Sequence, residues 1–500
     1  MADPAAARSA AHDGGNDHLG GGEKGGSRAV FTSGTATRSP GHRQRHAVVV
    51  GGSIAALLTA RALVGHADRV TVVERDRFPD GPGQRAGVPQ GRHIHVLLEG
   101  GARAMEELLP GIVAELSEHG APRVGMPRDL VQWQAGRFYR RTTTTADLLT
   151  GSRPLLEWLV RRRVLADPRI TVMEGTEVVG LLGDAARVRG VQLRERGART
   201  RTDVRSLTAD LVVDASGRGS RAPQWLAAIG ADPAHEERID TGLSYATRIY
   251  RSPEDAEGVE TAGYYFIPGG GTERGAVALP FEDGRYLVTL SGLRGCEPPS
   301  DEDAFTEFTA RLAHPVLYEW LSKARPESAV HSFRSTANVR RRYDRPGRRP
   351  AGFLATGDAL CAFNPVYGQG MTVAAFGALA LRDALADRRR TPTTRRVQKA
   401  LLQASRQAWD IAAGADKNLP AARGNVRAGR AVERPAVWYM ARVVERAPNN
   451  PVIGTAFRGV CALAEPTSAL FAPAVVRATL FGALRPALTE PPLRPESVDG

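Results

Sequence analysis

The glycine-rich segment after the first apolar run is the part of the sequence best suited to hold a phosphate. Gly51, Gly52 and Ser53 stand together in it, and Ala56 follows three residues later. The first glycine allows a tight turn, and a small residue two positions later lets the backbone approach a pyrophosphate. Ser53 can also donate its hydroxyl, and Ala56 is small enough to face the strand. The segment is therefore a loose match to a dinucleotide-binding turn.

The elements that must position this turn have the pattern of a β–α–β unit. Residues 46–51 form a short apolar run typical of a buried parallel strand, and 53–65 carry apolar residues at helical spacing. Residues 69–74 are a second, β-branched run that ends in Glu74, where a carboxylate can accept from a ribose. The helix would direct its free N–H groups at the phosphates. The alternative is an ordinary glycine-rich turn with a solvated Glu74.

Two further segments place charged residues and glycines where they could meet the same ligand. The first begins at Arg85 and contains His93 and His95, which are more typical of packing histidines than of catalytic bases. In the second, Asp358 closes an apolar strand, and the glycine-rich turn at 364–371 opens a helix. The N-terminus of that helix is a positive pole beside whatever the turn holds. The three segments together predict a dinucleotide site.

The rest of the chain alternates helical and strand-like patterns. We predict helices over 101–119, 153–167 and 368–388 from the spacing of their apolar residues. Residues 241–295 contain four strand-like runs separated by turns, which predicts an antiparallel sheet. After residue 390 the pattern is mostly helical.

The composition is that of a globular protein with a basic surface. The chain has 500 residues, 42% of them hydrophobic, and its 67 Lys and Arg against 54 Asp and Glu give a net charge of +13. The cations are nearly all scattered arginines, so we interpret them as solvated faces and expect no nucleic-acid partner. A surface for nucleic acid, a membrane or an acidic partner is the less favoured alternative. Three distant cysteines argue against a metal site, and the lack of a long apolar run or signal peptide predicts a cytoplasmic protein.

Segments along most of 46–485 resemble FAD-dependent monooxygenases of the aromatic hydroxylase and squalene epoxidase superfamily. The matching segments occur in family order and include VVVGGSIAALL, VTVVERD, RAGVPQGRHIHVLL, SRPLLE, ADLVVDASGRGSR and GDALCAFNPVYGQGM. SYATRIYRSP, RSTANVRRRYDR and TEPPLRPESV look more closely like the actinobacterial polyether epoxidases of the lasalocid and monensin type. They also look like other flavin oxidoreductases of that branch. The resemblance implies the chemistry more firmly than the substrate.

The resemblance implies an α/β fold with a Rossmann-like FAD-binding domain of the glutathione-reductase type. An antiparallel β-sheet substrate domain would be inserted in it, and a helical region would end the chain. We expect a disordered tail at 1–45, the FAD-binding domain at 46–240 and 346–390, the substrate domain at 241–345 and the helical region at 391–490.

The resemblance also implies which residues bind FAD. The first turn would line the pyrophosphate, Glu74 would hold the adenosine ribose, and Arg85 and Arg153 would contact the phosphates or the ribityl chain. Asp358 would bind ribityl or pyrophosphate oxygens, and the turn at 367–371 would present N–H groups to the flavin. The predicted FAD-binding residues are Gly51, Gly52, Ser53, Ala56, Glu74, Arg75, Arg85, Arg153, Val178, Asp214, Gly217, Asp358, Pro365, Tyr367, Gly368, Gln369, Gly370 and Met371.

The activity that the resemblance implies is a flavin monooxygenation. O2 and electrons from NAD(P)H would form a C4a-hydroperoxyflavin, which epoxidises alkenes of a polyketide-like precursor without a protein nucleophile or a metal. Two alternatives remain open: an aromatic hydroxylase with the same flavin chemistry, and a flavoprotein that reduces alkenes as geranylgeranyl reductases do. The Trp-x-Trp-x-Ile-Pro segment of flavin halogenases is absent, which argues against halogenation.

The expected partners follow from the same comparison. Residues 214–217 read Asp-Ala-Ser-Gly where the aromatic hydroxylases carry an Asp-Gly motif linked to nicotinamide contact. NAD(P)H would therefore visit the flavin transiently, or a separate flavin reductase would supply the electrons. The substrate would be a lipophilic small molecule. The C-terminal helices would cap its channel or lie on a membrane, so membrane contact is peripheral at most. The sequence does not indicate whether the protein is a monomer or an oligomer.

Overall fold

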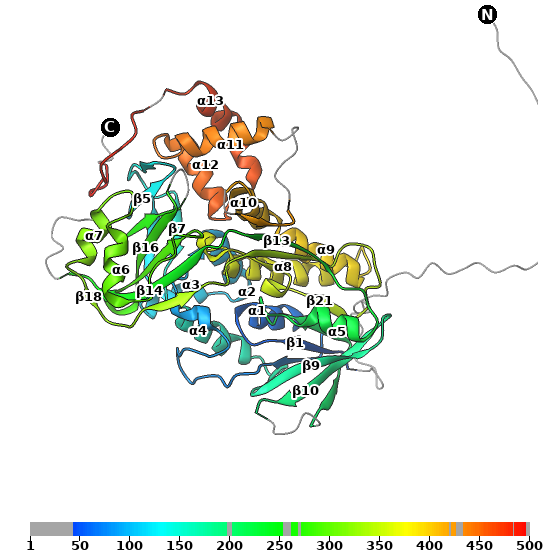
Figure 1. The fold of residues 1–500 in the computed structure, drawn as a ribbon. Coiled ribbons are helices and arrows are strands. Elements are labelled where there is room, and N and C mark those ends of the chain that lie inside the picture. Colours follow the sequence, from blue (N-terminus) through cyan, green and yellow to red (C-terminus); the bar gives the residue numbers. More distant parts are fainter. Residues whose placement is uncertain are drawn as a thin grey trace, which may run out of the picture.

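A computed structural model describes most of the chain after the N-terminal segment. The described residues are 44–197, 203–253, 262–268, 272–419, 422–426, 434–483 and 485–496. The predicted disordered tail at 1–45 lies outside them except for its last two residues. Figure 1 shows a lower part around α1 and β1, a sheet covered by α6 and α7, and a group of helices, α11 to α13, at the top.

A five-stranded parallel sheet forms the centre of the lower part. Its strand order is β21-β12-β1-β2-β8. The strands are β1 (His46–Val50), β2 (Arg69–Val73), β8 (Ile170–Met173), β12 (Leu211–Asp214) and β21 (Phe353–Ala355). The two strands predicted from their apolar runs are therefore present. They read as nearly continuous valine because both faces of a parallel sheet are covered.

Helices on this sheet complete the predicted β–α–β unit. Helix α1 (Ile54–Leu63) directly follows the glycine-rich turn and packs against α8 (Gly370–Ala386) and α4 (Arg153–Leu165). Helix α9 (Thr394–Ala404) packs on the other side of α8. The predicted mixed α/β fold with a Rossmann-like β–α–β unit is therefore present.

The predicted single helix over 101–119 is wrong. The structure has α2 (Glu99–Leu108) and α3 (Ile112–Glu118) instead. Pro110 and Gly111 separate them, and Gly111 has a φ of 86°, a left-handed conformation that no continuous helix contains. The apolar spacing continues across the break because both helices bury one face against the same core.

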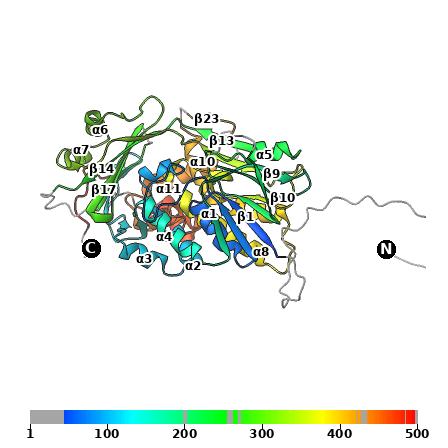
Figure 2. The same cartoon turned by 90° about the horizontal axis from the view of Figure 1, so that it is seen from below.

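A three-stranded antiparallel sheet lies beside the parallel one. It consists of β9 (Thr176–Gly183), β10 (Val188–Glu195) and β11 (Arg205–Thr208). The following helix, α5 (Ala222–Ala228), contacts β9. Both views place this sheet at the edge of the lower part, away from α6 and α7 (Figure 2).

The second large sheet has eight strands. The four strand-like runs predicted in 241–295 are β14 (Ser244–Arg251), β15 (Gly263–Phe266), β16 (Arg274–Phe281) and β17 (Arg285–Gly292). The others are β5 (Leu130–Gln134), β6 (Arg137–Phe138), β18 (Arg325–Pro326) and β19 (His331–Phe333). Helices α6 (Glu302–Thr309) and α7 (Val316–Leu321) share a core with it.

This sheet departs from the predicted one in two ways. Strand β5 pairs parallel to β15, so the sheet is not purely antiparallel. Strands β5 and β6 come from outside 241–345, so the sheet takes residues from a segment that we had assigned to the FAD-binding domain. Strand alternation predicts that a segment is extended, but not which sheet it joins.

Smaller sheets connect the two large parts. One has the order β22-β20-β13-β23, and the other has the order β3-β7-β4. Their strands are β13 (His235–Asp240), β20 (Asn338–Arg342), β22 (Cys361–Ala362), β23 (Arg423–Gly424), β3 (Leu97–Leu98), β4 (Arg123–Met126) and β7 (Ala146–Leu149).

The C-terminal helices form a separate layer over the site. After α10 (Arg406–Asp416) come α11 (Arg434–Arg446), α12 (Pro451–Cys461), the 3₁₀ helix η6 (Thr467–Phe471) and α13 (Pro473–Phe481). Tyr439, Val443, Ile453 and Val460 make a small core there, and Tyr139 joins it. Among the described residues, no helix is both long and apolar enough to cross a membrane.

Candidate active site

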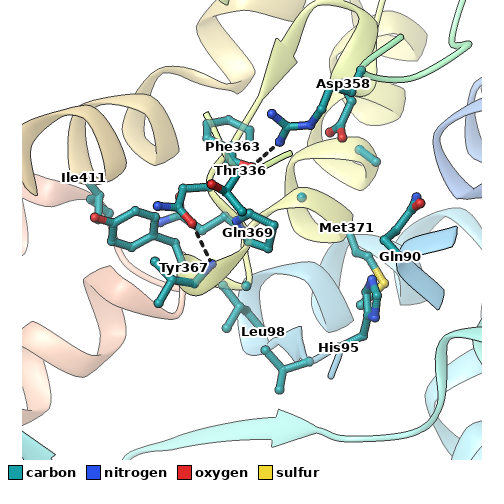
Figure 3. Close-up of a pocket in the computed structure, with 18 of the residues that line it drawn as sticks. Gln90, His95, Leu98, Thr336, Asp358, Phe363, Tyr367, Gln369, Met371 and Ile411 are labelled. Carbon is teal, nitrogen blue, oxygen red and sulfur yellow. Dashed lines mark hydrogen bonds between the residues drawn. The ribbon is translucent and has the colours of Figure 1, made fainter. Parts of the chain in front are cut away.

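One large cavity of 1820 Å³ lies where the three parts of the molecule meet. Ser53 and Met371 line it from the lower part, Tyr265 from the eight-stranded sheet and Met440 from the C-terminal helices. Figure 3 shows the region around Tyr367, Gln369 and Met371. A cavity bounded by three separate units can hold a cofactor and a substrate side by side.

The glycine-rich turn requires its two glycines for different reasons. Gly51 has a φ of 104°, and a Cβ there would lie 2.7 Å from the Ala215 carbonyl oxygen. At Gly52, a Cβ would lie 2.8 Å from both Glu74 Oε2 and Phe78 Cζ. The first N–H groups of a helix have no acceptor within the helix. The Ser53 side chain does not cap α1, so it does not satisfy these N–H groups either. The turn therefore offers an anion site at the cavity wall.

A buried carboxylate holds the side chains around this turn. Arg153 Nη2 donates to Ser53 Oγ at 2.7 Å, and Ser53 Oγ donates to Glu157 Oε2 at 2.7 Å. Arg85 Nε donates to Glu157 Oε1 at 2.8 Å. Burial would raise the pKa of the Glu157 carboxyl, but the nearby Arg153 and Arg85 guanidinium groups lower it below its usual value.

Sequence reasoning missed Glu157. It lies four residues after Arg153 on α4, a spacing that places both side chains on one face of the helix. The i,i+4 spacing of Arg153 and Glu157 indicates an ion pair in the sequence, but most ion pairs with this spacing lie on the surface of a helix. Only the fold shows that this one is buried, with Glu157 5% exposed.

Three predicted FAD-binding residues do not line the cavity. Ala56 is fully buried. Asp214 is also fully buried, and its carboxylate accepts hydrogen bonds from Ser216 and Ser220. Arg85 is enclosed by carboxylates, with Nη1 at 3.5 Å from Glu74 Oε2. These residues shape the walls behind the cavity and do not face its interior.

The other predicted residues come together along the cavity. They come from the segments that follow β1, β2, β12 and β21, from α4 and β9, and from the turn before α8 and the first residues of that helix. The ones that line it are Gly51, Gly52, Ser53, Glu74, Arg75, Arg153, Val178, Gly217, Asp358, Pro365, Tyr367, Gly368, Gln369, Gly370 and Met371.

Two carboxylates are placed to accept from hydroxyl groups. Glu74 accepts from the Asp76 N–H through Oε1 at 2.8 Å. Asp358 lines the cavity, and within the described residues its carboxylate has no hydrogen bond or ion pair. Burial raises the pKa of Asp358, although Arg218 and Arg153 act in the opposite direction. A sugar or ribityl hydroxyl would supply the donor that this carboxylate lacks.

The turn before α8 is built to expose its backbone. Gly368 has a φ of 64°, and a Cβ there would lie 2.7 Å from Val96 Cγ2. Helix α8 begins at Gly370, so the N–H groups of its first turn have no helical acceptor. Gln369 Oε1 is buried without a partner. The turn therefore has free donors and one free acceptor beside the cavity, which fits the polar edge of an isoalloxazine.

A buried polar network fixes this turn from behind. Tyr367 Oη donates to Asp416 Oδ1 at 2.5 Å, and Asn364 Nδ2 donates to Asp416 Oδ2 at 3.2 Å. Asn338 Nδ2 donates to the same oxygen at 2.6 Å, and Tyr245 Oη donates to Asn364 Oδ1 at 3.0 Å. Burial raises the pKa of both tyrosines well above the usual value, so their phenols stay neutral. No sequence motif links these residues.

The two predicted packing histidines both line the cavity, where His93 is buried and His95 is partly exposed. His93 Nδ1 lies 2.8 Å from Thr247 Oγ1, and His95 Nδ1 lies 2.9 Å from the His93 carbonyl oxygen. Burial lowers the pKa of His93 to about 4. Burial and the charge of Arg153 lower the pKa of His95 to about 3. Both imidazoles are therefore neutral and weakly basic at neutral pH.

Beyond the turn, the cavity continues as an arm with mostly apolar walls. Strands of the eight-stranded sheet form one side, and the C-terminal helices form the other. Its apolar lining includes Met126, Leu130, Phe266, Val277, Leu279, Met440, Val444, Phe457, Val460 and Leu470. We call this region the substrate arm.

Comparison with known proteins agrees with this geometry. A family model described as "FAD binding domain" matches residues 44–413. The chain belongs to this FAD-binding family. Protein Rv3254 of Mycobacterium tuberculosis is 36% identical to it over 355 residues, which cover 69% of this chain and 74% of that protein.

Solved structures share the fold of this FAD-binding protein. The myxobacterial chondrochloren halogenase CndH matches with a TM-score of 0.58 at 16% identity, over 85% of this chain and 99% of that chain. PqsL of Pseudomonas aeruginosa, a probable FAD-dependent monooxygenase, matches with a TM-score of 0.55 at 18% identity, over 83% of this chain and 99% of that chain. Membership of the FAD-binding family is thus confirmed, while similarity to the polyether epoxidases stays a prediction.

Proposed function

We propose that the protein is an FAD-dependent monooxygenase that epoxidises alkenes of a lipophilic, polyketide-like substrate. The observation that carries the proposal is the continuity of the cavity. The same 1820 Å³ space runs from the glycine-rich turn past Asp358 and the α8 turn into the apolar substrate arm. Such a space can hold FAD at one end and a long apolar molecule against the flavin at the other.

FAD fits the polar end of this cavity. The turn at Gly51 and the start of α1 would hold the pyrophosphate, Glu74 would hold the ribose, and Asp358 would accept from the ribityl hydroxyls. When bound, FAD supplies the activation of O2, with electrons that derive from NAD(P)H. The free N–H groups at the start of α8 would stabilise negative charge on the reduced ring.

The protein's own contribution is binding, orientation and exclusion of water. Apolar walls from the sheet and the C-terminal helices would hold an alkene against the flavin and keep bulk solvent out. Epoxidation of an alkene would need no protein base, because no proton has to be removed from the alkene. Hydroxylation of a phenol benefits from a base, and both His93 and His95 are weak ones here. This difference favours the epoxidase over an aromatic hydroxylase.

The supply of electrons belongs to the same proposal. NAD(P)H would reduce the flavin during a transient visit, or a partner flavin reductase would do so. We further propose that the protein works in the cytoplasm, with membrane contact that is peripheral at most. Mixing the oxidised holoenzyme with NADPH under anaerobic conditions distinguishes the two routes, since only direct use bleaches the flavin without a reductase.

The activity is tested with reduced holoenzyme, ¹⁸O2, a linear polyene and a phenol, followed by mass spectrometry. We expect one ¹⁸O atom on the polyene at a former double bond. Oxygen on the phenol alone would contradict epoxidation and favour the hydroxylase. Saturation of the polyene without O2 would replace the monooxygenase with an alkene-reducing flavoprotein.

A further inference from the structure

Arg458 is a buried cation in the wall of the substrate arm. It lies on α12, is 5% exposed and lines the cavity. Its Nε donates to Thr145 Oγ1 at 2.7 Å. The guanidinium lies over Gly454, where a Cβ would come 3.0 Å from Nη1 and 3.2 Å from Nη2. Within the described residues, no carboxylate pairs with Arg458.

The titratable groups beside Arg458 do not supply a counter-charge. Burial raises the pKa of Tyr139 far above its usual value and that of the Cys461 thiol to about 12. Burial lowers the pKa of Arg458 to about 10, so the guanidinium remains charged at neutral pH. Glu445 also lines the cavity, but its Oε2 lies 3.8 Å from Arg442 Nη1. The positive charge is therefore uncompensated on its own side of the cavity.

The other buried arginines among the described residues each donate to a carboxylate or to a backbone carbonyl oxygen. Arg85 and Arg153 share Glu157. Arg141 donates through Nε to the Arg128 carbonyl oxygen and through Nη1 to the Leu493 carbonyl oxygen, both at 2.7 Å. Within the described residues Arg458 donates only to the Thr145 hydroxyl, so its charge lacks a counter-charge. A buried cation without a counter-charge is unfavourable, and an anionic ligand would supply one. Arg458 thus has the properties of a ligand-binding residue rather than those of an arginine in a structural ion pair.

A second polar group lies at the same end of the arm. Gln132 on β5 is 5% exposed, lines the cavity, and its Oε1 is buried without a partner. Gln132 Nε2 and Tyr139 Oη both donate to Gln134 Oε1, at 3.2 Å and 3.1 Å. Tyr139 is also one of the groups that act on the pKa of Arg458. Gln132, Gln134 and Tyr139 therefore form one hydrogen-bonded cluster in the cavity wall, and Tyr139 connects this cluster to Arg458.

We infer that Arg458 forms an anion subsite in the substrate arm and binds a carboxylate of the substrate. The inference rests on the proposed function and narrows its substrate class to unsaturated lipophilic carboxylic acids. The guanidinium would anchor the acid end, and the apolar walls would direct the hydrocarbon chain toward the flavin. A bidentate pair with a carboxylate suits the planar fork of arginine.

Binding of farnesoic acid and its methyl ester to the oxidised holoenzyme tests the subsite. Titration calorimetry without a reductant keeps this test separate from turnover. We expect the acid to bind about 10- to 100-fold more tightly than the ester, as for a hydrogen bond to a charged group. Arg458→Met should remove this preference, and Arg458→Lys should retain part of it. Arg446→Met is the matched control, because Arg446 joins α11 to the Ala478 and Gly482 carbonyl oxygens and does not line the cavity.

Thermal unfolding without ligand gives a second readout. If Arg458 serves a ligand, Arg458→Met should leave the melting temperature unchanged or raise it, because an unpaired buried charge is lost. A marked fall in Tm would instead show a structural role. Equal affinity of the wild type for acid and ester, or no binding of either, would overturn the inference. Selective acid binding without oxygen insertion would preserve the subsite and contradict the proposed function.

Discussion

Ser53 and Glu157 are 104 residues apart in the chain, yet the Ser53 hydroxyl donates to the Glu157 carboxylate at 2.7 Å. The serine belongs to the turn that opens α1, and the glutamate belongs to α4. Glu157 also receives hydrogen bonds from Arg85 and Arg153. The Glu157 carboxylate thus holds the Ser53 hydroxyl of the glycine-rich turn in place and compensates the positive charge of two buried guanidinium groups.

Replacing Glu157 with glutamine tests this arrangement. Glu157→Gln keeps the size but removes the charge that compensates Arg85 and Arg153. Breaking a buried ion pair costs about 3–5 kcal/mol, so we expect a clear loss in the free energy of unfolding. The affinity for FAD, measured by flavin fluorescence, should fall at least about tenfold. Glu157 positions the side chains of Ser53 and Arg153, and without its charge these side chains would no longer be held where FAD phosphates would bind.

The control for this variant is Glu107→Gln. Glu107 pairs with Arg382 at the surface, where ion pairs contribute about 0–1 kcal/mol. That variant should retain wild-type FAD affinity and stability. Equal behaviour of the two variants would show that Glu157 has no special place in the cofactor site.

Gly52→Ala should abolish FAD binding with one methyl group. The added Cβ would lie 2.8 Å from Glu74 Oε2 and from Phe78 Cζ, so the ribose-facing carboxylate would have to move. The flavin content of the purified protein measures the effect directly. Gly65→Ala is the matched control, because nothing lies within 4 Å of a Cβ at Gly65. Yellow, fully loaded Gly52→Ala protein would show that the turn does not hold the cofactor.

The sequence predicted the central β–α–β unit because its signals are local. Apolar runs mark β1 and β2, and the glycine between strand and helix has the positive φ that the turn requires. Pro110 and Gly111 also carry a local signal, because both residue types disfavour a continuous helix. The apolar spacing continues past them, so spacing alone does not reveal the break between α2 and α3.

The parts of the site that the sequence did not reveal depend on long-range contacts. Asp416 meets Tyr367 across 49 residues and Asn338 across 78, and neither pair has a spacing motif. Strands β5 and β6 join a sheet whose other members begin more than a hundred residues later. Arg458 stands in an ordinary amphipathic helix, and only the fold shows that it is buried in the cavity wall. The chemistry of a side chain can be predicted from the local sequence, whereas the residues that it contacts are determined by the fold.

Tyr367→Phe tests whether the buried network holds the flavin turn. The change removes the hydroxyl that donates to Asp416 Oδ1 and leaves a buried carboxylate oxygen without that donor. We expect a loss of about 1–3 kcal/mol in the free energy of unfolding by urea. Tyr318→Phe is the control, because Tyr318 Oη donates to Glu307 at the surface and should matter little. A loss equal to that of the control would mean that the network does not stabilise the turn.

The two histidines in the cavity wall predict an acid-dependent loss of stability. An unfolded histidine has a pKa near 6.5, whereas His93 and His95 have pKa values of about 4 and about 3 in the folded protein. The unfolded state therefore binds more protons below pH 6.5, so stability falls as the pH decreases from about 6.5 toward 4. His95→Gln should flatten this part of the curve of unfolding free energy against pH, by on the order of 1 kcal/mol per pH unit. Above about pH 8 the slopes of the wild type and of His95→Gln should coincide, because histidine is neutral there in both states. An unaltered slope in His95→Gln would show that His95 does not remain neutral in the folded protein.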